Sequence, residues 1–159
     1  MSASATLADP IADTLVLPGE TCQRSLRLSR EDIAAFARLS GDSNPLHHHL
    51  LAAQRARHGE ILASGQHTTA LMMGLAASHF SRAAEAGVGR EVLCLNFNFS
   101  FKAPVFADQP LDLFWRVASV EWHERLGGLL VQIDGRVAVR HAAPAVVGRG
   151  TLLVKAVPA

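Results

Sequence analysis

The spacing of hydrophobic residues changes along the chain, from helical in its first half to strand-like in its second. In residues 91–101 (EVLCLNFNFSF), every second side chain from Leu93 to Phe101 is leucine or phenylalanine. This period of two predicts a half-buried strand. Three more strands are predicted at 111–122, 128–140 and 148–157, and Gly127-Gly128 is typical of a hairpin turn between the first two of these.

Two helices are predicted before these strands. The first follows Ser29, an N-cap candidate with Asp32 three residues on, and it ends at Gly41. The second runs from the N-cap candidate Ser64 to a stop signal at Gly87, which gives ~22 residues and a length of roughly 33 Å. Small and apolar residues occur on nearly all of its sides, so we expect this helix to be buried on most faces.

The order of elements indicates the fold class. Residues 13–29 look like extended chain broken by Pro18-Gly19. An extended segment, two helices and four consecutive strands are typical of α+β architecture. One long apolar helix wrapped by a curved antiparallel sheet would provide the burial that the helix needs. We therefore expect a single domain over residues 13–159 and a flexible tail over residues 1–12.

Composition narrows the class of protein. The chain has 159 residues, of which 49% are hydrophobic and 18% are charged, so the composition is globular. A net charge of +1 argues against a nucleic-acid partner. No apolar run is long enough for a membrane span, and the N-terminus lacks a signal-peptide pattern. Cys22 and Cys94 have no metal-ligand spacing, so we expect a cytoplasmic protein with reduced thiols.

Residues 40–50 (SGDSNPLHHHL) contain the highest concentration of side chains that could take part in catalysis. Asn44 suits an N-cap and Pro45 the first position of a new helix, which would place His47 in the first turn. Gly41 and Ser43 would form a bend that turns Asp42 back to face His47. Such a pair could share one water molecule and move its protons. The alternative is that the acid and the amide only serve turn geometry.

The other histidines have a weaker claim to chemistry. Successive side chains diverge, so at most one or two of the three can face a common point. A metal site that combines this run with His58 or His67 lacks the paired histidine spacing with a nearby acid that would support it. We therefore predict no metal site, and we expect His48 and His49 to lie on the surface.

A second candidate site is Ser64-Gly65-Gln66, at the start of the long helix. Unpaired amides of a first helical turn can polarise a ligand carbonyl, and Gly65 would allow the carbonyl a close approach. The alternative is that Gly65 only lets the helix pack tightly against the sheet.

The segment FARLSGDSNPLHHHLLAA resembles the signature of the MaoC-like dehydratases and (R)-specific enoyl-CoA hydratases. The resemblance rests on Phe36 and Ser40 and then on Gly-Asp-x-Asn-Pro-Leu-His, Gly41 to His47. The segment NFSFKAPVFADQPL also resembles a strand of that family. The likeness covers most of the chain from about Leu28 onward. One departure is Ser64, where the family commonly has histidine before the glycine.

The resemblance implies a hot-dog fold, with one long helix wrapped by an antiparallel sheet. It implies reversible hydration of a trans-2-enoyl-CoA to an (R)-3-hydroxyacyl-CoA, with Asp42 and His47 as the catalytic pair and the Gly65 amide bound to the thioester oxygen. Asn44, Ser64, Gln66 and Lys102 are then candidates for substrate binding, and Arg57 is a further candidate near the CoA phosphates. The CoA thioester is the substrate, so no cofactor is expected.

Rival functions remain at this point. An acyl-CoA thioesterase on the same fold would commonly carry an acid on the central helix, and this chain has none there before Glu85. A non-catalytic subunit that binds acyl thioesters is the second rival, and a histidine-rich metal protein is the third. A sheet curled around one helix leaves an edge that a second subunit can cover, so we expect a homodimer or a larger assembly of dimers.

Overall fold

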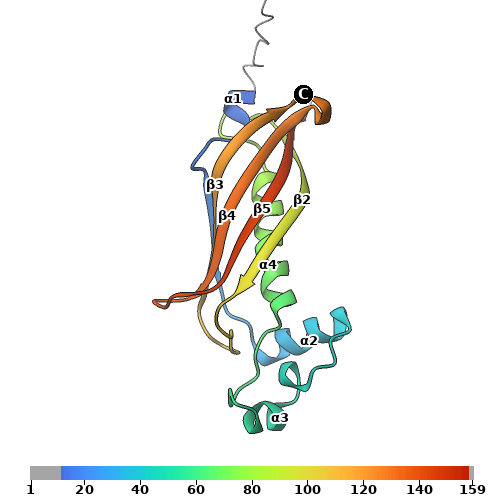
Figure 1. The fold of residues 1–159 in the computed structure, drawn as a ribbon, viewed down its shortest axis with the longest axis vertical. Coiled ribbons are helices and arrows are strands. Elements are labelled where there is room, and N and C mark those ends of the chain that lie inside the picture. Colours follow the sequence, from blue (N-terminus) through green and yellow to red (C-terminus); the bar gives the residue numbers. More distant parts are fainter. Residues whose placement is uncertain (1–11, 158–159) are drawn as a thin grey trace, which may run out of the picture.

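The computed structural model describes residues 12–157 of the chain. Figure 1 shows one curved sheet that follows a long central helix. In chain order the elements are α1 (Ala12–Leu15), β1 (Thr21–Leu26), α2 (Arg30–Ser40), the 3-10 helix η1 (Pro45–His47), α3 (Leu50–Arg55), α4 (Gly65–Phe80), β2 (Arg90–Phe101), β3 (Leu111–His123), the 3-10 helix η2 (Glu124–Leu126), β4 (Gly128–Val139) and β5 (Pro144–Ala156).

The five strands form one antiparallel sheet in the order β1-β3-β4-β5-β2, so β1 and β2 are its edges. Helix α4 runs along the sheet, and α2 and α3 lie beyond the end of the sheet from which α4 starts (Figure 1). The predicted α+β architecture, a curved antiparallel sheet around one long helix, is confirmed. The two ends of α4 therefore lie in different surroundings.

Helix α4 is fixed to the sheet by an apolar face and by one buried hydrogen bond. Met72, Ala76 and Phe80 are buried at helical spacing on this face. The indole Nε1 of Trp115, on β3, donates to the carbonyl oxygen of Met72 at 2.8 Å. Because this bond pairs a buried indole N–H, it satisfies a group that would otherwise be costly to bury.

The prediction for the end of this helix was wrong. Helix α4 stops at Phe80, not just before Gly87, and has 16 residues. The guanidinium of Arg90 donates to the carbonyl oxygens of His79 and Arg82, which a continuing helix would have used for its own amides.

The side of α4 that carries Gln66, Ala70, Met73 and Gly74 is exposed in this subunit.

Strand β2 also departs from the simple alternation. A bulge lies between Cys94 and Asn96, so the side chains before and after it change faces. Phe97 and Phe99 pack against the core, whereas Leu93 is 50% exposed. The expectation of one continuous half-buried row from Leu93 to Phe101 is therefore wrong for its first part.

The N-terminal segment differs from the extended chain that was expected. Ala12–Leu15 forms the short helix α1, and the strand begins only at Thr21, after the turn at Pro18-Gly19. The tail predicted over residues 1–12 lies outside the described residues, except for Ala12.

Candidate active site

The bend that carries Asp42 is built from local signals. Gly41 ends α2 in the left-handed conformation with φ 73°, which glycine adopts without a steric penalty. The Asp42 carboxylate accepts from the Asn44 amide at 3.0 Å, and the Asn44 side chain accepts from the Leu46 amide at 3.1 Å. Asn44 is thus the predicted N-cap, with Pro45 at the first position. The new helix is only the three-residue η1, and α3 begins separately at Leu50.

This bend brings Asp42 and His47 together. The Asp42 Oδ2 to His47 Nε2 distance is 3.5 Å, with 19% and 7% of the two side chains exposed. On the other side of the ring, Nδ1 lies 2.6 Å from the carbonyl oxygen of Leu62. Because a carbonyl only accepts, a neutral His47 carries its proton on Nδ1 and turns an unprotonated Nε2 toward the acid.

The Asp42–His47 pair therefore has unused hydrogen-bonding capacity. An ionised carboxylate and an unprotonated ring nitrogen are both acceptors, so neither can donate to the other. A molecule with two O–H bonds, such as water, can donate to both and keep its lone pairs free. The arrangement is suited to orienting one water molecule and accepting a proton from it.

The neighbouring histidines serve the backbone. His48 and His49 are exposed, as predicted, and Nδ1 of His49 accepts from the Ala52 amide at the start of α3. His48 Nε2 lies 3.2 Å from the carbonyl oxygen of Ser43. Within residues 12–157, no three His, Cys, Asp or Glu side chains are grouped so as to hold a metal ion.

A surface cavity of about 430 Å³ reaches Asp42. Its lining includes Arg38, Gly41, Asp42, Ser43 and His48. The acid is thus accessible from this cavity, whereas the buried His47 does not line it. Among residues 12–157, Asp42 is the one acidic side chain that lines this cavity.

The second candidate site lies at the start of α4. The Ser64 hydroxyl accepts from the His67 amide at 3.2 Å, which makes Ser64 the predicted N-cap, and Ser64 is buried. Gln66 is exposed. A Cβ added to Gly65 would come within 2.7 Å of the Phe101 ring, so a side chain at this position would require the ring to move. The two interpretations of Gly65, ligand approach and tight packing, are therefore compatible.

The charged candidates lie on the surface. Lys102 follows the end of β2, and its backbone amide donates to the Ala145 carbonyl at 2.8 Å. Its side chain is exposed, as is that of Arg57 between α3 and the start of α4. The structure does not bring either side chain into contact with the Asp42–His47 pair.

His67 is a buried polar residue for which the sequence offered only a weak metal-site argument. Its ring stacks on Phe36 with centroids 4.3 Å apart, and Nδ1 is buried with no hydrogen-bond partner among the described residues. Burial holds the pKa of His67 below its usual range, and the Asp32 carboxylate only partly offsets this. We therefore expect a neutral imidazole.

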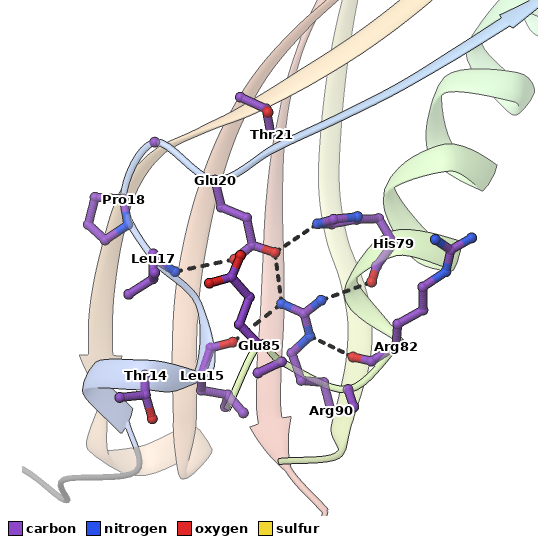
Figure 2. A pocket seen from close by; sticks show the side chains of 13 residues that line it. Thr14, Leu15, Leu17, Pro18, Glu20, Thr21, His79, Arg82, Glu85 and Arg90 are labelled. Carbon is purple, nitrogen blue, oxygen red and sulfur yellow. Dashed lines mark hydrogen bonds and ion pairs between the residues drawn. The ribbon is translucent and has the colours of Figure 1, made fainter. Parts of the chain in front are cut away.

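A second acid–histidine pair lies at the other end of α4, beside a cavity of about 520 Å³. Figure 2 shows Glu20 between His79 and Arg90. Glu20 Oε1 lies 2.7 Å from His79 Nε2 and 2.9 Å from Arg90 Nη1, and Oε2 accepts from the Leu17 amide. Arg90 also donates to three backbone carbonyls, those of Leu15, His79 and Arg82.

This second cluster is internally satisfied. Burial alone would raise the pKa of Glu20, but the hydrogen bonds from Arg90, His79 and the Leu17 amide outweigh it and hold the pKa below its usual range. Each carboxylate oxygen and the His79 Nε2 already has a partner. The cavity is larger than the one at Asp42. The polar groups beside it, however, already hydrogen-bond to one another and connect the N-terminal segment to the end of α4.

Two further observations concern the environment of the protein. Cys22 and Cys94 are both free, and burial raises the pKa of the Cys22 thiol to about 11, so this thiol stays protonated at neutral pH. None of the helices in residues 12–157 has both the length and the apolar character needed to cross a membrane.

Solved structures share this architecture. An (R)-hydratase from A. caviae, involved in PHA biosynthesis, matches with a TM-score of 0.75 and 24% identity over 87% of this chain and 96% of the other. A MaoC-like dehydratase from Rhodospirillum rubrum matches with a TM-score of 0.71 and 19% identity, over 91% and 96%. At these identities the likeness shows a shared fold, the hot-dog fold.

A two-chain protein is also similar. The C-terminally truncated HadBC complex from Mycobacterium tuberculosis, a 3R-hydroxyacyl-ACP dehydratase, matches with a TM-score of 0.68 and 20% identity, over 87% of this chain and 96% of the other. A search of curated protein sequences gives no match.

The family assignment comes from the sequence itself. The family model for the MaoC like domain matches residues 14–127, which is more than half of the chain. The match includes the Asp42–His47 bend, the start of α4 and Phe101. The chain therefore belongs to the MaoC-like domain family.

Proposed function

We propose that this protein is a hydro-lyase that adds water reversibly to a trans-2-enoyl-CoA and gives an (R)-3-hydroxyacyl-CoA. The proposal rests on two neighbouring hydrogen-bond acceptors, on Asp42 and His47, that receive no hydrogen bond from each other. Asp42 Oδ2 and His47 Nε2 face each other at 3.5 Å, and His47 Nδ1 is held by the Leu62 carbonyl. Membership of the MaoC-like family and the fold shared with an (R)-hydratase support the same reaction.

In the proposed reaction, one water molecule donates to Asp42 and to His47. Its oxygen bonds to C3 of the enoyl group while one of its protons passes to the pair, and C2 then receives a proton from the pair. Hydroxyl and hydrogen thus arrive from the same side of the double bond, which makes the addition syn. Dehydration is the same path in reverse.

The thioester oxygen is placed at the Gly65 amide. This amide belongs to the first turn of α4, where N–H groups lack intrahelical partners and the helix dipole favours negative charge. Negative charge develops on the thioester oxygen as C3 is attacked, so a donor fixed there stabilises the transition state. Leu62, which holds the His47 ring, lies three residues before Gly65 and so couples the two parts of the site.

Other residues have proposed supporting roles. Asn44 shapes the bend through its cap on Leu46, and Ser64 fixes the first turn of α4. Gln66 and Lys102 are proposed to contact the substrate outside the reacting atoms. The thioester is itself the substrate, so the proposed reaction uses no cofactor. A cytoplasmic location and a role in fatty acid metabolism are proposed on the same basis.

The thioesterase alternative has less support. Helix α4 contains no carboxylate from Gly65 to Phe80, so it offers no acid to activate water for attack on the thioester carbon. The alternative of a non-catalytic acyl-thioester-binding subunit draws support from the two-chain complexes among the similar structures, such as the truncated HadBC dehydratase. The free acceptor pair of Asp42 and His47 argues for activity in this chain.

We also propose that the protein is a homodimer or an assembly of dimers. Edge strand β2 exposes Leu93, Leu95 and Phe101 by 50%, 48% and 58%, beside a helix that exposes Met73 by 37%. An unpaired strand edge next to apolar side chains is a surface that proteins normally cover. A second copy would cover it, and light scattering on the purified protein measures the mass.

The function is tested by incubating the protein with crotonyl-CoA and longer trans-2-enoyl-CoAs and following the loss of enoyl-thioester absorbance. A chiral analysis of the product distinguishes (R) from (S). Release of free thiol, measured in parallel on saturated acyl-CoAs, identifies hydrolysis. Thiol release without hydration would favour the thioesterase, and neither activity would favour the non-catalytic subunit.

A further inference from the structure

The aromatic ring of Phe101 stands directly against the first residue of α4. A Cβ built on Gly65 would come to 2.7 Å from Cζ and 2.8 Å from Cε1 of Phe101. Protein interiors do not tolerate carbon atoms at such separations, so no side chain fits at position 65 while the ring keeps its place. On this side, the space beside the Gly65 amide ends at the ring.

Burial in the core does not explain this placement. Phe97 and Phe99, on the same strand, pack against the core near Trp115, whereas Phe101 is 58% exposed. A phenylalanine gains free energy on folding in proportion to the area it removes from water. Because more than half of Phe101 stays accessible in the subunit, core packing alone does not account for its contact with Gly65.

The backbone around the ring is fixed relative to α4. Phe101 pairs with Val146 on β5, and the next amide, that of Lys102, donates to the Ala145 carbonyl at 2.8 Å. The segment just before α4 is tied to the same loop, because the Ala63 amide donates to the Val105 carbonyl at 2.8 Å. Short backbone links therefore fix the backbone that carries the Phe101 ring relative to the start of α4.

We propose that Phe101 is a specificity-determining residue that restricts the substrate to thioesters without a branch at C2. The inference rests on the proposed function, because it places the thioester oxygen at the Gly65 amide. An oxygen that accepts from this amide lies about 2.9 Å from the nitrogen, and C2 is two bonds from that oxygen. A methyl group on C2 then needs space of the same size and in the same region as the Cβ that the ring excludes.

Two isomeric ligands test this directly by binding. Butyryl-CoA and isobutyryl-CoA have the same composition and differ in a branch at C2, and neither can be hydrated. Titration calorimetry gives Kd for both. We expect the wild-type protein to prefer butyryl-CoA by at least about tenfold, in the range that one misplaced methyl group produces in a shaped pocket. In Phe101→Ala we expect the ratio to fall below about threefold, with Phe101→Leu in between.

Trp122 provides the matched control. It is 52% exposed, and it pairs with Leu129, which pairs with Val154, opposite Val92 near the start of β2. It therefore lies at the other end of the sheet from Phe101. Trp122→Ala removes an exposed aromatic ring of similar accessibility and should leave the butyryl preference unchanged. Light scattering on each variant reports any change of assembly, and Phe101→Leu retains an apolar side chain in case the alanine variant dissociates.

The outcomes separate this inference from the proposed function. An isomer preference that persists in both Phe101 variants would overturn the assignment, as would a wild-type protein that binds neither ligand or binds both equally. A preference that depends on Phe101, found in a protein that hydrates no enoyl-CoA, would keep the specificity assignment and reject hydration. In an active protein, Phe101→Ala should raise kcat/KM for the C2-methylated tiglyl-CoA relative to crotonyl-CoA by about fivefold or more.

Discussion

The two ends of α4 each carry an acid next to a histidine, and the two pairs differ in how completely their hydrogen bonds are satisfied. At the start of the helix, Asp42 and His47 stand 3.5 Å apart, and no donor from the described residues lies between them. At the end of the helix, Glu20 and His79 are 2.7 Å apart, and Arg90 donates to the same carboxylate oxygen.

This difference indicates that the Asp42–His47 pair can bind a substrate, whereas the Glu20–His79 pair has a structural role. A group can hold a substrate only with hydrogen-bonding capacity that the protein has not already used. Glu20 and Arg90 use theirs to connect the N-terminal segment, α4 and β2, and the Arg90 side chain is only 3% exposed. Proximity of an acid and a histidine is therefore not sufficient evidence of catalysis, and the count of unpaired acceptors decides between the two pairs.

Asp42→Asn should produce the largest effect on activity. Asparagine keeps an oxygen that can accept from the Asn44 amide, so the bend is retained, but the base is lost. We expect kcat/KM for the best enoyl-CoA to fall by about 10²–10⁴-fold, the range for loss of a general acid–base group. The free energy of unfolding should change by less than about 0.5 kcal/mol. Full activity in this variant would show that the unpaired acceptors of Asp42 and His47 do not mark the catalytic site.

Two substitutions of His47 test the roles of its two ring nitrogens separately. In His47→Asn the amide nitrogen takes the place of Nδ1 and can still donate to Leu62, whereas the acceptor at Nε2 is removed. Activity should fall by about 10²-fold or more, and stability should change little. In His47→Gln the bond to the Leu62 carbonyl is lost, so unfolding should become easier by about 1–3 kcal/mol as well. Steady-state kinetics and urea unfolding measure both.

Glu20→Gln should have the reverse effect, with a large loss of stability and almost no change in activity. It removes the charge that faces the buried Arg90 guanidinium, which keeps its three carbonyl acceptors. We expect a loss of about 2–3 kcal/mol in the free energy of unfolding, near the lower end for a broken buried pair. Activity per folded molecule should stay within about twofold, since the cluster lies at the far end of α4 from Asp42. A hundredfold loss of activity with unchanged stability would overturn this separation.

How far the sequence could predict these two sites depends on the distance along the chain between their residues. The bend at Asp42 follows from Gly41, Asn44 and Pro45, whose turn and cap preferences act within a few residues. Glu20 is 59 residues from His79 and 70 from Arg90, and no local pattern connects them. Their meeting depends on the curvature of the sheet, which brings both of its edge strands, β1 and β2, against α4.

The same limit explains the other differences. The stop signal at Gly87 predicted too long a helix because Arg90, a residue from the next strand, takes the carbonyls of the last turn. The row of apolar residues in β2 predicted one buried face, but the bulge after Cys94 changes it. At Gly65 the sequence left ligand approach and packing open, because the ring that packs against this glycine comes from Phe101 on a different element.

Acid should weaken the ion pairs that Glu20 makes with His79 and Arg90. The pKa of Glu20 is lower in the folded protein than its ordinary value of 4.5, so its contribution is fully present above that value. As pH falls below about 4.5 toward the folded pKa, protonation removes the contribution. The stability difference between wild type and Glu20→Gln should therefore shrink over this window in urea unfolding at stepwise lower pH. A difference that stays constant to the lowest pH would contradict the role of the charge.

The smallest effect is expected from the two remaining histidines of the run. His48→Ala/His49→Ala removes the imidazole that caps the Ala52 amide at the start of α3, so stability should fall by about 1 kcal/mol or less. Both side chains are exposed, and neither contacts the facing atoms of Asp42 and His47, so kcat/KM should stay within about twofold. The matched contrast is His47→Asn, one residue away. A collapse of activity in the folded double variant would mean that hydrogen-bonding capacity at His47 Nε2 does not identify the reacting histidine.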